Sequence, residues 1–173
     1  QTLWQWLPTT PVGPGDSPYQ SPSAFAGSPL MVALEPLVEQ GWLTQPTLPD
    51  GGFSSERVEF SRVIPWRDGQ LRAAAAGFAA RANPADRQAH DAWCAREAAW
   101  LDDYALFMAL KESRPGLAWN RWPEGLAKRD PAALAQAQLV ADAAKGTALH
   151  AQAESTVEAL RRLRKLAGDA VDI

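Results

Sequence analysis

The uneven distribution of proline limits where this chain can form long helices. Nine of its fourteen prolines lie within the first fifty residues. Because proline lacks an amide hydrogen and clashes with the preceding helical turn, this region should form turns and short elements. The composition changes near residue 56, and from Pro65 onward alanine, leucine, arginine and glutamate favour helix. We therefore expect a mainly α-helical protein with a small β part.

The first fifty residues suggest one strand and one short helix. The apolar run at 3–7 resembles a buried strand that ends at Pro8, and a loop follows to about Gly27. An extended or turn segment is expected around 30–34. A short helix should hold Pro36 in its first turn and stop at Gly41, because proline favours helix starts and glycine favours helix ends.

Three longer helices are expected after this region. The first should cover Pro65–Arg81 and end before Asn83, since a residue that precedes proline resists the helical conformation. The second should cover Pro84–Lys111, with Trp93, Trp100, Tyr104, Phe107 and Met108 on one buried face. The third should begin near Asp130, an N-cap followed by proline, and break at Gly146.

Charge and cysteine content exclude several classes of function. The formal net charge is −3 and there is one cysteine, Cys94. A chain without a long basic run is a poor partner for nucleic acid. A single cysteine excludes a disulfide framework and fits a reducing compartment, so we expect a cytoplasmic location. No apolar segment approaches the length of a membrane span.

The loop after the expected strand carries the candidate binding residues. Asp16 can accept hydrogen bonds from sugar hydroxyls, and Ser17 can both donate and accept them. Tyr19 offers a ring for apolar contact with a sugar face and a hydroxyl that would orient it. The alternative is that Asp16 and Ser17 only cap a turn, because Asp-Ser-Pro is a common turn sequence.

Several segments together resemble the amylomaltases, bacterial 4-α-glucanotransferases of glycoside hydrolase family 77. The similarity covers the first strand and loop, the start of a helical insertion, a helix and the loop that follows it, in the segments 4–27, 63–67, 100–111 and 119–123. The resemblance implies that Ser17 and Tyr19 contact the glucan near the cleavage point, with Asp16 beside them. Pro14 replaces an aromatic residue often found there, which argues against a secondary glucan site on this loop.

The tryptophans have structural and sugar-binding interpretations. Trp93 and Trp100 occur at helical spacing, so we expect them in the core rather than against a sugar. Trp119 and Trp122 lie in the loop that follows the long helix. We interpret both as anchors of that loop against the helices.

No catalytic or metal-binding group is evident from the residue pattern. Asp102 and Asp103 are adjacent, so on a helix they point about 100° apart and cannot form a carboxylate pair by themselves. A solvent-exposed face or a cap contact explains them better. His90 and His150 lack a second ligand at metal-binding spacing, so the sequence predicts no metal ion and no cofactor.

The amylomaltase resemblance implies a fold that this chain only begins. A (β/α)₈ barrel needs about 250 residues and eight strands. Retaining glycosyl transfer needs two carboxylates about 5 Å apart, and the family motifs Asp-His-Phe-Arg-Gly and Glu-Asp-Leu-Gly do not occur here. The chain also starts at Gln1 without an initiator methionine. We therefore expect an N-terminal portion of a TIM barrel that does not catalyse alone.

Three regions follow from this interpretation. Residues 1–56 would hold the first barrel strand, the substrate loop and a connection, residues 57–145 a helical insertion subdomain, and residues 146–173 a divergent C-terminal helix. The expected partner is a maltooligosaccharide or another α-glucan, while the sequence does not specify the oligomeric state. The alternative function is a non-catalytic helical module that binds glucan or another protein.

Overall fold

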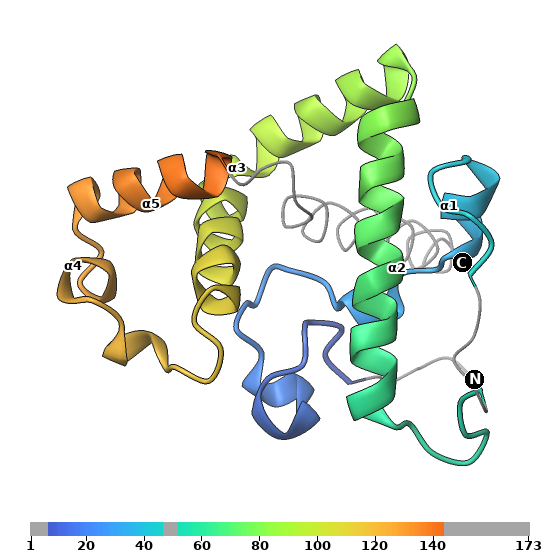
Figure 1. Cartoon of the computed structure of the whole chain (residues 1–173), viewed down its shortest axis with the longest axis horizontal. Coiled ribbons are helices and arrows are strands. Elements are labelled where there is room, and N and C mark those ends of the chain that lie inside the picture. The colour runs from blue at the N-terminus through green and yellow to red at the C-terminus, as the bar shows by residue number, and fades with distance from the viewer. Residues whose placement is uncertain (1–6, 47–51, 144–173) are drawn as a thin grey trace, which may run out of the picture.

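A computed structural model describes residues 7–46 and 52–143 of the 173-residue chain. The described part is mainly helical (Figure 1), as expected, with the α-helices Glu35–Glu39 (α1), Phe60–Arg81 (α2), Pro84–Glu112 (α3), Glu124–Ala127 (α4) and Pro131–Ala143 (α5). Four 3₁₀ turns accompany them at Pro14–Asp16 (η1), Pro18–Gln20 (η2), Pro29–Met31 (η3) and Trp119–Arg121 (η4).

The described residues contain no strand, so the expected β part has no counterpart among them. The strand predicted at 3–7 falls almost wholly outside the described residues. Of that range only Leu7 is described, and it lies in irregular backbone with its side chain 60% exposed. The break predicted at Gly146 and the helix predicted at 146–173 also lie outside the described residues.

Prolines start the short elements of the N-terminal region. Each of η1, η2, η3 and α1 has proline at its first or second position, where the missing amide hydrogen removes no helical bond. Helix α1 ends before Gly41, which adopts a φ of 72°. The short helix around Pro36 is therefore confirmed, and the segment at 30–34 contains a turn as predicted.

Helix α2 begins five residues earlier than the sequence suggested. Pro65 lies inside the helix rather than at its start. An interior proline costs about 3 kcal/mol, because it removes a hydrogen bond and crowds the preceding turn. Tertiary contacts offset this cost: Leu71 and Ala74 are buried, and the Arg67 guanidinium donates to the Val32 carbonyl.

Helix α3 agrees with the prediction to within one residue at its end. The Asn83 side chain accepts a hydrogen bond from the Asp86 amide at 2.9 Å, which satisfies one free donor of the first turn. Trp93, Leu101 and Leu110 are buried. Of the five residues predicted for the buried face only Trp93 is buried, while Trp100, Tyr104, Phe107 and Met108 are half-buried. The two buried leucines were not among the predicted residues.

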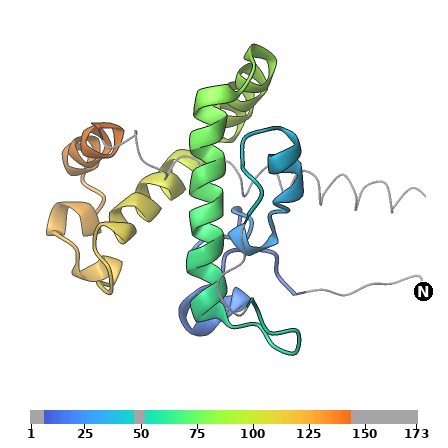
Figure 2. The same cartoon turned by 45° about the vertical axis from the view of Figure 1, so that its right-hand side comes forward.

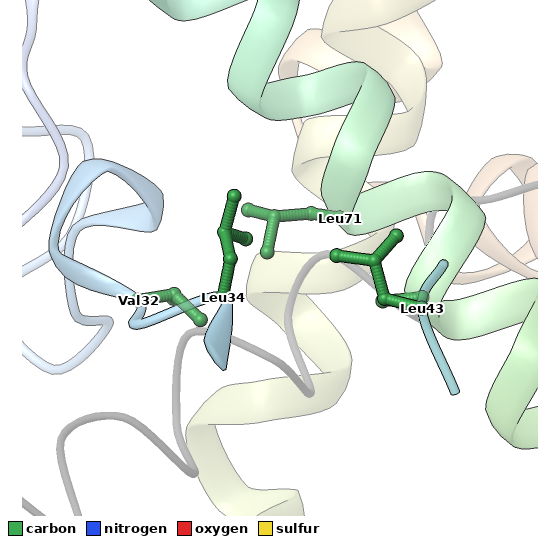
Figure 3. Packing of buried hydrophobic residues seen from close by; sticks show 5 residues of the cluster. Val32, Leu34, Leu43 and Leu71 are labelled. Carbon is green, nitrogen blue, oxygen red and sulfur yellow. The ribbon is translucent and has the colours of Figure 1, made fainter. Parts of the chain in front are cut away.

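The main hydrophobic core joins the N-terminal region to α2. It consists of Val32, Leu34, Leu43, Leu71 and Ala74, with Leu71 fully buried. Figure 3 shows the side chains of Leu34 and Leu43 on either side of Leu71. Residues before and after the compositional change near residue 56 therefore share one core.

The C-terminal helices pack on the other side of the molecule. Asp130 accepts hydrogen bonds from the amides of Ala132 and Ala133 at 3.1 and 3.0 Å, which confirms the predicted N-cap of α5. Helix α5 contacts α3 and α4. In Figures 1 and 2, α1 and α5 lie on opposite sides of α2. Within the described ranges, no helix is both long and apolar enough to cross a membrane.

Candidate functional site

The candidate binding loop consists of two successive 3₁₀ turns, η1 and η2. The Gly13 amide donates to the Ser17 carbonyl at 2.9 Å, and the Gln20 amide donates to the same oxygen at 3.3 Å. A Cβ added at Gly13 would lie 1.7 Å from the Gln20 carbonyl oxygen, so only glycine fits there. Gly15 and Asp16 adopt φ values of 68° and 58°, in the left-handed region. This backbone gives the loop a defined shape.

The three predicted residues share this double turn but differ in exposure. The Ser17 hydroxyl oxygen accepts a hydrogen bond from the Tyr19 amide at 3.3 Å, so Ser17 does cap the turn, while its contact with a glucan stays a prediction. A hydroxyl that accepts one bond can still donate one, and it has a second acceptor site. Asp16 is exposed, and the Tyr19 side chain is 73% exposed. The turn therefore leaves hydrogen-bonding capacity and an aromatic ring available to a ligand.

Serine side chains fix the second half of the loop. The Ser23 hydroxyl accepts hydrogen bonds from the amides of Phe25 and Ala26 at 3.1 and 3.0 Å. The Ser28 amide donates to the Thr9 carbonyl at 2.7 Å, which joins the two ends of the loop. The loop is thus closed by backbone and hydroxyl contacts rather than by a buried apolar cluster of its own.

An aromatic contact links this loop to α3. Phe25 stacks on Trp100 with ring centroids 5.9 Å apart and planes 22° from parallel. Trp100 also contacts Trp93 and Tyr104, at 6.5 and 6.3 Å. Burial among these groups raises the pKa of Tyr104 to about 12. Sequence reasoning missed Phe25, because a single aromatic residue in a loop has no periodicity to indicate its partner.

The two loop tryptophans have different environments. Trp122 is 7% exposed, its ring lies 5.5 Å from that of Phe107, and its indole nitrogen donates to the Leu117 carbonyl at 3.4 Å. The prediction that it anchors the loop is confirmed. Trp119 is 58% exposed, so the same prediction is wrong for Trp119. The 3₁₀ turn η4 directs these two side chains differently although they are three residues apart.

Two further groups of polar side chains lie on or beside α3, outside the binding loop. Arg129 binds both carboxylate oxygens of Asp103, at 2.8 and 2.7 Å, which ties the segment before α5 to α3. His90 contacts Asp91 and the Cys94 sulfur, at 3.0 and 3.4 Å. Among the residues that the structure describes, no three histidine, cysteine or acidic side chains are placed to hold a metal ion.

Burial shifts the pKa of one carboxyl group between the two long helices. Asp68 on α2 is half-buried, and desolvation raises its pKa, while nearby Arg72 opposes the shift. Arg72 also pairs with Glu112 on α3 at 2.6 Å. This group of charges connects α2 to the end of α3. None of its residues belongs to the loop that carries Tyr19.

Comparison with known proteins identifies the family. The family model described as 4-alpha-glucanotransferase matches residues 1–169. The 4-alpha-glucanotransferase of Thermus thermophilus is 50% identical over 135 residues, which are 78% of this chain and 26% of the relative. That of Synechocystis is 39% identical over 136 residues, or 78% of this chain and 27% of the relative.

A solved structure agrees with these sequence matches. The structure titled amylomaltase from Streptococcus agalactiae in complex with acarbose has a TM-score of 0.77 and 25% identity, and the match covers 94% of this chain and 32% of that one. The chain spans about a quarter of the length of the curated relatives that it matches. Because the family model covers nearly all of its residues, the chain belongs to the 4-alpha-glucanotransferase family.

Proposed function

We propose that this chain supplies the first strand, the glucan-binding loop and the helical insertion of a 4-α-glucanotransferase. In this proposal residues 3–7 form the first strand of a (β/α)₈ barrel, residues 1–56 include the substrate loop, residues 57–145 form the insertion, and residues 146–173 form a divergent C-terminal helix. The family match and the mainly helical described part support it. The ligand is an α-1,4-glucan, and the cytoplasm is the proposed location.

The exposure of Tyr19 is the observation that most supports glucan binding. Its ring is 73% exposed on a double turn whose backbone is fixed by the bonds at Gly13 and Ser17. A fixed and exposed aromatic ring suits contact with a sugar face, because little conformational entropy is lost on binding. Ser17 would donate to a sugar hydroxyl, and Asp16 would accept from one.

The isolated chain is proposed to bind glucan without transferring it. Retaining transfer requires a nucleophilic carboxylate and an acid/base carboxylate about 5 Å apart. The two family motifs that carry those groups are missing from this sequence. We therefore propose that glycosyl transfer requires the longer chain found in the relatives. The residues of this chain would position the substrate.

Isothermal titration with maltoheptaose tests the binding assignment. The wild-type chain should bind, and Tyr19→Ala should weaken binding by about tenfold or more, because a contacting aromatic ring contributes roughly 1.5–3 kcal/mol. Tyr19→Phe should keep most of the affinity that the ring supplies. Trp119→Ala is the matched control, since it removes another exposed aromatic side chain outside the loop. Equal heats for wild type and Tyr19→Ala would refute the assignment.

The same titration distinguishes glucan binding by the loop from the alternative function, a non-catalytic helical module. If maltoheptaose binding survives Tyr19→Ala unchanged, the glucan contact lies in the helical part, as a non-catalytic helical module requires. A transfer assay on the isolated chain with maltotriose should detect no glucose release. Measurable turnover would contradict the proposal that the carboxylates are supplied elsewhere.

A further inference from the structure

Arg67 of α2 reaches the segment that follows the binding loop. Its guanidinium donates a hydrogen bond to the Val32 carbonyl, 35 positions earlier in the chain. Val32 is 4% exposed and packs in the same core as Leu71 of α2 (Figure 3). Val32 also follows directly after the 3₁₀ turn η3, which contacts α2. The helix and the end of this turn are therefore joined by a side-chain hydrogen bond as well as by apolar packing.

Stability alone does not explain an arginine at this position. Arg67 is half-buried, and desolvation lowers its pKa, while the charge of Glu35 opposes the shift. The Arg67 Nε is buried and has no hydrogen-bond acceptor among the described residues. A buried donor without a partner costs free energy that an apolar side chain would not cost. The hydrogen bond to the Val32 carbonyl is the contact that an apolar side chain could not replace.

A series of hydrogen bonds continues from η3 to the binding loop. Ser28 precedes η3, is 4% exposed, and donates from its amide to the Thr9 carbonyl at 2.7 Å. The next residue, Thr10, donates from its hydroxyl to the Pro18 carbonyl at 3.4 Å. Pro18 directly precedes Tyr19 in η2. The position of the Tyr19 backbone therefore depends on contacts that begin at η3.

We propose that Arg67 is a positioning residue for glucan binding. By holding the Val32 carbonyl, it fixes η3 against α2, and η3 in turn fixes the loop that presents Tyr19 to the sugar. The helix α2 thus contributes to substrate binding without touching the substrate. A loop that is already ordered loses less conformational entropy on binding, so loss of this hydrogen bond weakens glucan affinity. The inference rests on the proposed function, because that function assigns the glucan contact to Tyr19.

Isothermal titration of Arg67→Met with maltoheptaose tests this role. Methionine keeps an apolar side chain beside the core but removes the donor to Val32. The dissociation constant should rise by about fivefold, within the range by which residues remote from a ligand alter its binding. Arg67→Lys keeps a charged donor and should restore most of the affinity. Circular dichroism should show the same helix content in wild type and in both variants.

Arg81→Met is the matched control on the same helix. Arg81 also donates from α2 to backbone carbonyls of the N-terminal region, those of Gly41 and Trp42, at 2.7 and 2.8 Å. These carbonyls follow α1 and lie outside the series of hydrogen bonds that leads from η3 to Tyr19. Arg81→Met should therefore lower the stability of the chain and leave its maltoheptaose affinity unchanged. An equal loss of affinity in both methionine variants would make the role of Arg67 purely structural and overturn the proposal.

Amide hydrogen exchange measures the ordering of the loop independently of glucan binding. The Gly13 and Ser28 amides are both hydrogen-bonded within the loop. In Arg67→Met they should exchange about fivefold faster than in wild type, because local opening of the loop becomes easier. In Arg81→Met both rates should stay unchanged.

The two measurements together give clear grounds for rejection. Unchanged exchange in Arg67→Met would overturn the proposal, because Arg67 would then not order the loop. Faster exchange with unchanged maltoheptaose affinity would also overturn it, because loop order would then not matter for binding. If the wild-type chain binds no maltoheptaose, the proposed function fails and the glucan role of Arg67 fails with it, whereas the exchange rates still show whether Arg67 orders the loop.

Discussion

Replacement of Gly77 by alanine should destabilise the chain, although alanine is the better helix former. Gly77 lies within α2, where α2 meets the turn at Gly41 and Trp42. A Cβ at this position would lie 1.7 Å from the Trp42 carbonyl oxygen, and real Cβ contacts essentially never fall below 3.0 Å. Helix and turn must therefore separate by about 1.3 Å, the difference between these values.

The separation would break the contacts that hold this turn. Arg81 donates to the carbonyls of Gly41 and Trp42 at 2.7 and 2.8 Å, and the Trp42 ring meets Phe78 edge-on at 4.9 Å. Each charge-assisted hydrogen bond contributes about 1.5 kcal/mol, and the ring pair contributes about 1 kcal/mol. The higher helix propensity of alanine offsets about 1 kcal/mol of this loss. The expected net loss in the free energy of unfolding is therefore about 3 kcal/mol.

Gly69→Ala is the matched control on the same helix. A Cβ at Gly69 has nothing within 4 Å, so this variant should gain about 1 kcal/mol from helix propensity alone. Urea unfolding followed by circular dichroism measures both variants against wild type. If Gly77→Ala is as stable as Gly69→Ala, the close approach of α2 to Trp42 is refuted.

Three further predictions concern a cap and two shifted pKa values. Asn83→Ala should lower the free energy of unfolding by about 1 kcal/mol in urea, because the Asp86 amide loses its acceptor; an unchanged midpoint would contradict the cap. In Tyr19→Phe, Tyr104 is the only tyrosine, and its phenolate absorbance should appear with a midpoint near 12 rather than the ordinary value of about 10. Since unfolded tyrosine ionises first, stability should fall as the pH rises from about 10 toward the native pKa. Burial raises the pKa of Asp68, so its contribution to stability is full below the unfolded pKa and is lost as pH rises through the native pKa. Asp68→Asn should flatten that part of the measured pH–stability profile, and an identical profile would argue against the shift.

Local chemistry explains why the helix ends were predictable. Asn83 and Asp130 each place a side-chain acceptor beside free amides of the following turn, and a proline follows each of them. Gly41 has the left-handed backbone that ends a short helix. These effects act over four or five residues, so a single sequence contains them.

The predictions from sequence were wrong where contacts between residues far apart in the chain outweigh the local conformational preference of a residue. Pro65 suggested a helix start, but the packing of Leu71 and the Arg67 contact to Val32 keep the preceding turn helical. Trp119 and Trp122 have the same side chain, yet only Trp122 reaches Phe107. Which of two aromatic residues becomes buried depends on the position of α3, which the loop sequence does not contain.

The candidate site was predictable as a loop but not in its environment. The prolines, glycines and serines of 13–28 indicated a stiff turn. The glucan-binding role of Asp16, Ser17 and Tyr19 comes from the amylomaltase resemblance and stays a prediction. The stacking of Phe25 on Trp100 joins residues 75 positions apart. Sequence reasoning gave no reason to choose that pair among the aromatic residues of the chain.

The sequence alone determined the family, the helical character beyond residue 56 and the turn chemistry of the loop, because these depend on residue type and short spacing. The tertiary structure decided that Leu71 joins the proline-rich region to α2, that Trp119 stays exposed, and that Phe25 rests on α3. Each of these depends on which surfaces meet after the chain folds back on itself, and the hydrophobic effect that drives burial is non-directional. Residue type therefore favours burial, while geometry selects the partner.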